Sequence, residues 1–178
     1  RVIAFLHPWS NINDSGYQIT QSLFAIGTGG WFGLGIDQGD PTSIPYVEQD
    51  FIFSAVAEEM GVLFGLCLIL ICVSCFIVFM KIAMQLKEEF YRYIAVGLST
   101  IYIFQVFLTI GGAIRFIPST GVTLPLVSYG GSSLVSSILI FYIIQGMYLL
   151  KEDEDLQIEK ERAARTKERK AKKAKEKS

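Results

Sequence analysis

The chain has 178 residues, of which 51% are apolar, and its formal net charge of −1 comes from 16 Lys and Arg against 17 Asp and Glu. The charges are unevenly spread, because residues 60–80 and 93–114 contain none. Uncharged stretches of this length can cross the hydrocarbon core of a bilayer as helices. The composition therefore excludes a water-soluble globular domain and predicts an all-α polytopic membrane protein.

The cysteines and the histidine do not indicate a metal or redox site. Cys67, Cys72 and Cys75 all lie in the first uncharged stretch. Their spacing is not that of a metal site, and we interpret them as small apolar residues. The single histidine, His7, gives no support to a histidine-based triad or a zinc site.

Residues 1–50 are predicted to form a large extracellular loop. A turn cluster over 11–16 precedes a short helix expected over 18–26. The glycine-rich segment 27–35 does not fit a dinucleotide-binding motif, because no strand precedes it. We expect a flexible loop there, lying on the membrane interface with Trp31 and Phe32 as anchors.

Acidic residues mark the start of the first predicted transmembrane helix, residues 51–81. Asp50 is expected at its N-terminus, where the helix dipole favours an anion, and its simplest role is an N-cap. Glu58 and Glu59 follow two turns later, and one of this pair must face a cavity or a partner. Three carboxylates so close together are more than capping requires, so acid/base chemistry becomes a candidate.

The second predicted transmembrane helix covers residues 93–113 and follows a cytoplasmic loop over 82–92. Gln105 and Thr109 lie one turn apart on it and form a polar stripe. The stripe is compatible with hydrogen bonding between helices and equally with contact to a substrate.

The connection over 114–131 is predicted to be an extracellular, re-entrant-like loop. It carries no charge after Arg115, and prolines and glycines interrupt it. Irregular apolar backbone at the membrane persists only where it packs on protein or lines a cavity. The Gly-Gly-Ser-Ser sequence over 130–133 then starts the third predicted transmembrane helix, residues 132–150. Its backbone N–H groups can bind an anion, although this is also an ordinary helix start.

The tail over 151–178 carries 11 Lys and Arg and 8 Asp and Glu. The positive-inside rule places this tail and the 82–92 loop in the cytoplasm, with residues 1–50 and 114–131 outside. Interleaved charges favour a solvated helix or contact with the lipid surface over nucleic-acid binding. An outside N-terminus without a signal peptide leads us to expect further segments upstream.

Four patches, over 16–22, 50–61, 118–125 and 128–133, resemble the SEDS family (shape, elongation, division and sporulation proteins). They include Asp50-Phe51-Ile52-Phe53 and Ser128-Tyr129-Gly130-Gly131-Ser132-Ser133. The resemblance extends over residues 16–150 and implies a polytopic peptidoglycan glycosyltransferase, of which this chain would be the C-terminal part. Gln49, Thr109 and Arg115 depart from the family's usual residues and suggest a divergent branch.

The resemblance implies that lipid II is polymerised at the outer face of the bacterial cytoplasmic membrane, during division, elongation or sporulation. Asp50 matches the family's essential aspartate, expected to act as general base on the acceptor hydroxyl. The departing diphosphate requires positive charge from Arg115, from helix N–H groups or from a divalent cation such as Mg²⁺ or Mn²⁺. No acid spacing establishes a metal site. The predicted substrate-binding residues are Gln18, Glu58, Arg115, Ser128, Gly130, Gly131, Ser132 and Ser133.

The family resemblance also implies a class B penicillin-binding protein as partner, together with other divisome or elongasome membrane proteins. Two alternative functions remain open: a flippase for lipid-linked precursors, and a non-catalytic scaffold. Acids at the outer mouth of the helix, and not at the midplane, mildly disfavour the flippase. The isolated chain is expected to be inactive.

Overall fold

The computed structural model describes residues 5–6, 8–9 and 16–175, and all regular structure within these residues is helical. His7 and most of the expected turn cluster lie outside them. The main elements are α2 (Tyr17–Gly29), the 3₁₀ helix η2 (Pro41–Ser43), α3 (Ile52–Gln85), α4 (Glu89–Ala113) and α5 (Gly131–Lys175). Three helices, α3, α4 and α5, are long and apolar enough to cross a membrane, which confirms the predicted fold class.

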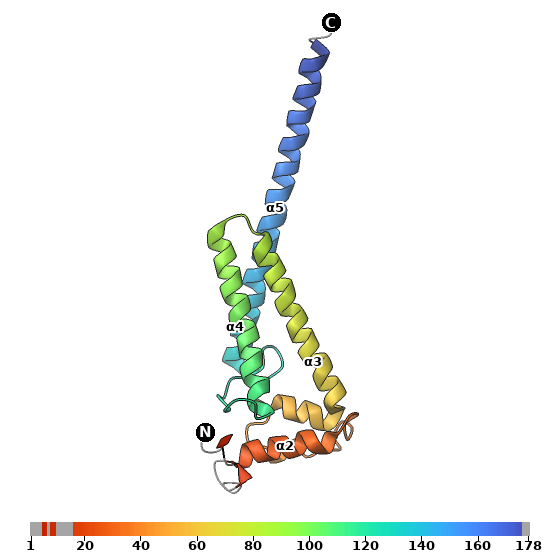
Figure 1. Cartoon of the computed structure of the whole chain (residues 1–178), viewed down its shortest axis with the longest axis vertical. Helices are drawn as coiled ribbons and strands as arrows, with labels where there is room; N and C mark the ends of the chain where they lie inside the picture. The colour runs from red at the N-terminus through yellow and green to blue at the C-terminus, as the bar shows by residue number, and fades with distance from the viewer. Residues whose placement is uncertain (1–4, 7, 10–15, 176–178) are drawn as a thin grey trace.

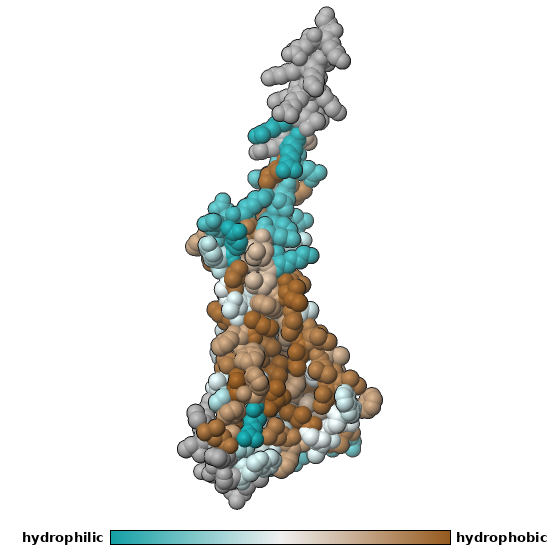
Figure 2. Space-filling model, viewed as in Figure 1, coloured by the Kyte–Doolittle hydropathy of each residue, from teal (hydrophilic) through white to brown (hydrophobic). Residues whose placement is uncertain are grey.

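The three long helices stand side by side, and α2 lies across one end of them (Figure 1). α3 has the most extensive contacts, chiefly with α4 and α2. Figure 2 shows a broad apolar belt on the visible face of the three-helix part and a polar surface on the extension of α5. Exposed side chains of the belt include Leu70, Ile71 and Phe104. A belt of this kind is expected to face lipid.

An aromatic cluster joins the three long helices. The rings of Phe79 of α3, Tyr102 of α4 and Phe141 of α5 meet edge to face. The ring centroids are 5.4 Å apart for Phe79 and Tyr102, 4.8 Å for Phe79 and Phe141, and 5.8 Å for Tyr102 and Phe141. Because lipid tails are as apolar as these side chains, close packing rather than exclusion from water holds such helices together. The cluster therefore fixes how the three helices fit against one another.

α3 is broken at Gly61, whose backbone angles are φ 85° and ψ 166°. Glycine adopts a positive φ without steric penalty, which other residues do not. Figure 1 shows the turns before the break running along α2 before the helix enters the bundle. The apolar pattern of residues 51–81 gave no indication of this break.

The backbone groups left open by the break are hydrogen-bonded by residues 30–35. The four bonds run from Leu34 N–H to the Glu58 carbonyl (2.9 Å), from Gly35 N–H to Glu59 (2.9 Å), from Val62 N–H to Gly30 (3.0 Å) and from Leu63 N–H to Trp31 (3.3 Å). The segment was expected to be a flexible loop, but its backbone completes a helix. The side chains of Trp31 and Phe32 are 67% and 85% exposed, and their role as interface anchors stays a prediction.

The end of α4 folds back sharply on itself. Arg115 has φ 57°, the N–H of Phe116 donates to the Gly111 carbonyl at 2.7 Å, and the N–H of Arg115 donates to Gly112 at 3.3 Å. This pair of bonds is a Schellman motif, with arginine where glycine is usual. It directs the following loop back along α4.

α5 continues past the bundle as one helix to Lys175, so the third predicted span and most of the tail are continuous (Figure 1). Near the bundle, Lys87 pairs with Asp155 at 3.0 Å, and Lys151 donates to Gln85 at 2.5 Å. Exposed pairs of this kind each contribute less than about 1 kcal/mol. They connect the turn between α3 and α4 to the extension of α5.

Candidate functional site

Asp50 is half-buried and lies directly before Phe51, the residue that precedes α3. Phe51 is only 1% exposed, so its side chain anchors the backbone in the core. Two residues before Asp50, the carbonyl of Glu48 accepts a hydrogen bond from the N–H of Tyr129 at 2.7 Å. The backbone is thus fixed on both sides of Asp50.

Hydrogen bonds join α2, α3 and the end of α4 beneath this segment. The buried hydroxyl of Ser22 donates to the Ala113 carbonyl at 2.9 Å and lies 2.5 Å from the hydroxyl of Ser54. Since a serine has one hydrogen to give, Ser54 is the donor between the two hydroxyls. Gln18 of α2 donates to the Pro45 carbonyl at 3.3 Å and so links α2 to the approach to Asp50.

A polar cavity of about 520 Å³ lies beside this segment. Its lining comes from the residue next to Asp50, from α4, from the loop after α4 and from the start of α5. The lining residues are Gln49, Gln105, Gly121, Val122, Thr123, Gly130, Ser132, Ser133 and Ser136. None of them is charged, so the cavity offers hydroxyls, amides and backbone groups.

The polar stripe of α4 holds the loop that forms one wall. Gln105 Nε2 donates to the Thr123 carbonyl at 2.9 Å. The Thr109 hydroxyl lies within hydrogen-bond distance of the carbonyls of Gln105 (3.0 Å) and Val122 (2.9 Å). These side chains bond chiefly to the loop, and Gln105 also reaches Ser133 of α5 at 3.4 Å and lines the cavity.

The first turn of α5 closes the cavity on the other side. Thr123 Oγ1 donates to Ser133 Oγ at 2.6 Å, and the N–H of Leu134 donates to the Gly130 carbonyl at 2.8 Å. The first N–H groups of a helix have no partner within the helix and carry a partial positive charge. The arrangement therefore favours an oxygen-rich or anionic ligand at this end of the cavity.

Of the predicted substrate-binding residues, Gly130, Ser132 and Ser133 meet at the cavity, and Gly131 is the first residue of α5. Ser128 is buried inside the loop, where its hydroxyl accepts from the N–H of Leu124 at 2.8 Å. It shapes the wall of the cavity without lining it.

Gln18, Arg115 and Glu58 lie elsewhere. Arg115 is half-buried and donates to the carbonyls of Phe5 (3.1 Å) and Leu6 (3.4 Å). Glu58 is 7% exposed; its Oε1 accepts from the N–H of Asp40 at 3.3 Å, and its Oε2 has no hydrogen-bond partner among the described residues. A role for these side chains in binding substrate stays a prediction.

Other residues of the cavity, among them Thr123 and Ser136, were not predicted from the sequence. Ser136 lies one turn after Ser132 and three residues after Ser133, so a polar stripe at helical spacing was present in the sequence. Thr123 carried no such signal, because nothing in the sequence shows which way a loop residue faces.

The described residues contain no group of three or more His, Cys, Asp or Glu side chains that could hold a metal ion. The described residues therefore do not by themselves form a site for the Mg²⁺ or Mn²⁺ ion that was considered from the sequence. The chemistry that it can supply is a carboxylate at Asp50 and neutral hydrogen-bond donors around the cavity.

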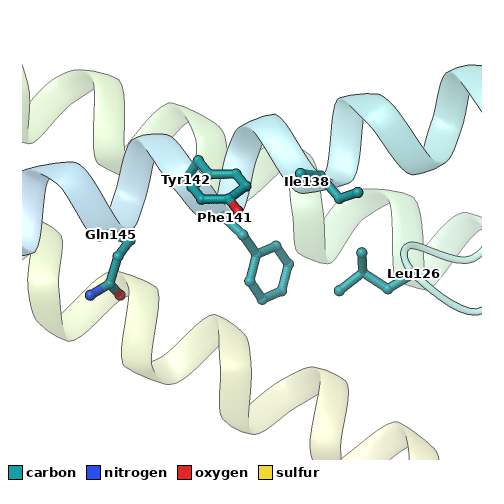
Figure 3. Close-up of a pocket in the computed structure, with 5 residues that line it drawn as sticks. All are labelled: Leu126, Ile138, Phe141, Tyr142 and Gln145. Atoms are coloured by element: carbon teal, nitrogen blue, oxygen red, sulfur yellow. The ribbon is translucent and has the colours of Figure 1, made fainter.

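A second, apolar groove of about 410 Å³ lies against α5. It is lined by Leu126, Ile138, Phe141, Tyr142 and Gln145, and Figure 3 shows Phe141 and Gln145 extending from α5 on the side of α3. Phe141 lies nine residues after Ser132, and Gln145 lies nine residues after Ser136. Nine residues are about two and a half helical turns, which places each later residue on the other side of the helix. The groove and the polar cavity therefore lie on opposite faces of α5.

The comparisons with known proteins identify the family of the chain. A family model described as Cell cycle protein, FtsW/RodA/SpoVE, matches residues 1–151. The chain belongs to the FtsW/RodA/SpoVE family. This confirms the resemblance to SEDS proteins that the four sequence patches indicated.

Two curated relatives in the FtsW/RodA/SpoVE family show what the chain is similar to. A probable peptidoglycan glycosyltransferase FtsW of Francisella salina is 46% identical over 142 residues, which are 76% of this chain and 35% of the relative. The peptidoglycan glycosyltransferase RodA of Mycobacterium bovis is 41% identical over 145 residues, 81% of this chain and 31% of the relative. The chain thus spans about a third of the length of these relatives.

A solved structure, reported for the structural coordination of polymerization and crosslinking by a peptidoglycan synthase complex, contains a similar chain. The match has a TM-score of 0.69 at 26% identity and covers 86% of this chain and 41% of that one. The membrane-spanning helices and the FtsW/RodA relatives together identify this chain as part of a multi-pass membrane protein.

Proposed function

We propose that this chain supplies the acid-bearing wall of an inverting peptidoglycan glycosyltransferase that polymerises lipid II at the outer face of the cytoplasmic membrane. The observation that carries the proposal is the polar cavity between the Asp50 segment and the start of α5. The names of the FtsW and RodA relatives support the same activity.

In this proposal Asp50 is the general base. It takes the proton from the 4-hydroxyl of the acceptor GlcNAc as that oxygen attacks the anomeric carbon of the donor muramic acid. The bond from this carbon to the diphosphate breaks, and undecaprenyl diphosphate leaves with the electron pair. The fixed backbone around Asp50 supports this role, because a general base must be held at hydrogen-bond distance from its proton.

The departing diphosphate would lie at the start of α5. The N–H groups of the first turn and the hydroxyls of Ser132 and Ser133 supply donors there. None of the cavity-lining residues is a cation, so full neutralisation requires charge from outside the described lining. Arg115 is one candidate on this chain, and the rest of the protein is another.

The proposal also covers sidedness and partners. The cavity and Asp50 would face outward, and the charged extension of α5 would enter the cytoplasm, as the distribution of Lys and Arg predicts. A class B penicillin-binding protein would bind the assembled protein. The similarity to a chain of a peptidoglycan synthase complex supports such a partner.

The decisive experiment follows glycan synthesis from purified lipid II on gels, with the whole protein purified together with its partner. Wild type is compared with Asp50→Ala and Asp50→Asn, and Glu48→Gln is the matched control. Glu48 is an exposed acid two residues away, and only its backbone carbonyl makes the bond to Tyr129. We expect polymer from wild type and Glu48→Gln and none from either Asp50 variant. Polymer from Asp50→Ala would remove Asp50 as the base, and no polymer from wild type would contradict the enzyme.

One observation favours a flippase as the alternative, because broken helices are frequent in transporters. In transporters, however, the open backbone groups of the break bind substrate or ions, whereas at Gly61 residues 30–35 already bond to them. Movement of lipid II across liposomes without polymer formation would favour the flippase. Full complementation by Asp50→Ala in cells would favour a scaffold.

A further inference from the structure

Three polar side chains from different elements meet in the wall of the cavity. Thr123 of the loop donates its hydroxyl hydrogen to Ser133 Oγ at 2.6 Å. Gln105 of α4 lies with Nε2 2.9 Å from the Thr123 carbonyl and 3.4 Å from Ser133 Oγ. All three residues line the cavity.

The hydrogen bonds around Ser133 determine the direction of its hydroxyl. A serine hydroxyl has two lone pairs to accept with and one hydrogen to donate. Thr123 and Gln105 both approach Ser133 as donors, so they occupy its lone pairs. None of the hydrogen bonds between described residues uses Ser133 Oγ as the donor. Its hydrogen therefore remains available on the side of the half-buried residue that faces the cavity.

We propose that Gln105 and Thr123 are positioning residues that hold Ser133 as a hydrogen-bond donor to an oxygen of the substrate diphosphate. The proposal rests on the glycosyltransferase function above. Donors of the lining gather at the start of α5, where the partial positive charge of the helix end suits an anionic oxygen better than a sugar hydroxyl.

The amide of Gln105 is essential to this arrangement. A carboxylate of the same shape at position 105 would accept where the amide donates. The hydroxyl of Ser133 would then turn its hydrogen back toward residue 105, and the cavity would lose a donor and gain a negative charge. Gln105→Glu is therefore predicted to weaken binding of an anionic substrate while conserving shape.

The test measures kcat and KM for lipid II polymerisation by the whole protein with its partner. The variants are Thr123→Val, Ser133→Ala, the double variant, Thr123→Ser and Gln105→Glu. Losing one hydrogen bond is expected to raise KM by roughly three- to tenfold in Thr123→Val and in Ser133→Ala. The double variant should be no worse than Ser133→Ala, because both changes remove the same donor. Thr123→Ser should restore wild-type KM, and Gln105→Glu should raise KM by roughly tenfold or more.

Two further threonines provide controls. Thr100 is exposed on α4 and bonds only to the Val96 carbonyl of its own helix at 2.8 Å, so Thr100→Val should match wild type. Thr109→Val loosens the same loop through Val122 without touching Ser133. The fold increases in KM caused by Thr109→Val and by Ser133→Ala should therefore multiply in the double variant. Those caused by Thr123→Val and Ser133→Ala should not.

The outcomes separate this inference from the proposed function. If wild type polymerises lipid II but the increases in KM caused by Thr123→Val and Ser133→Ala multiply in the double variant, the positioning role is wrong. The proposed glycosyltransferase function would not be affected by that result. A wild-type KM in folded Gln105→Glu would overturn the positioning role in the same way, even if the valine variant fails to fold. If wild type makes no polymer, the proposed function itself fails.

Discussion

The backbone N–H of Tyr129 donates to the carbonyl of Glu48 at 2.7 Å. This bond joins the segment that carries Asp50 to the segment that enters α5 at Gly131. Because both partners are backbone atoms, this link between the two walls of the cavity does not depend on a polar side chain. Side-chain substitutions in the cavity therefore leave this link in place.

Gly61→Ala is expected to destabilise the protein. A φ of 85° is strained for alanine, and the added Cβ would collide with the carbonyl of Trp31. We expect the free energy of unfolding to fall by about 1–3 kcal/mol, measured by thermal unfolding in detergent. Gly97→Ala is the control, because nothing lies within 4 Å of its added Cβ. A melting temperature for Gly61→Ala equal to that of the control would contradict the strained junction.

Ser22→Ala and Ser54→Ala should each lower stability, because the two hydroxyls form one chain that ends at the Ala113 carbonyl. Loss of a buried hydrogen bond is expected to reduce the unfolding free energy by about 0.5–2 kcal/mol. The two effects should not add, since either change breaks the same chain. Additive losses in a double-mutant cycle would show that the serines act separately.

Phe141→Ala should be the most damaging of these substitutions. Its ring contacts both Phe79 and Tyr102, so its loss leaves a cavity where the three long helices meet. The side chain is half-buried, so its removal is expected to lower stability by about 2–3 kcal/mol, below the range for a fully buried Phe. Phe104→Ala, at a side chain that is 58% exposed, is the control and should change the melting temperature little. Equal losses in the two variants would contradict a core at this position.

Substitutions of Glu58 distinguish two roles for its side chain: binding substrate, or holding the loop at Asp40. Glu58→Gln keeps an oxygen that can accept from the N–H of Asp40, so we expect stability and polymerisation to be retained. Glu58→Leu removes the acceptor of this part-buried hydrogen bond and should lower stability by about 0.5–1.5 kcal/mol. Loss of polymer synthesis in well-folded Glu58→Gln would instead support direct contact with substrate.

The sequence predicted the long helices well because charge-free stretches have few alternatives in a bilayer. It did not predict the break in α3, because Gly61 lies in a continuous apolar run and isolated glycines are tolerated in helices. The reason for that glycine is the close approach of residues 30–35, which only the folded chain reveals.

The candidate site was predicted in part for the same reason. Gly130, Ser132 and Ser133 form a local motif next to a helix start, so their common location follows from the sequence alone. The position of Glu58 against Asp40 depends on the path of the loop before α3, which no local pattern determines. Conversely, the extension of α5 was predictable, because no glycine or proline follows Gly146 and the residues there favour helices.

The uninterrupted α5 has a mechanical consequence. Its 45 residues form a rod roughly 68 Å long, with the cavity serines in its first turns and the charged segment at its far end. A rod without a hinge cannot turn at one end alone. A partner that twists the charged end is therefore expected to strain the packing of Phe141 and, beyond it, the hydrogen bonds of Ser133 at the opposite end of the bundle.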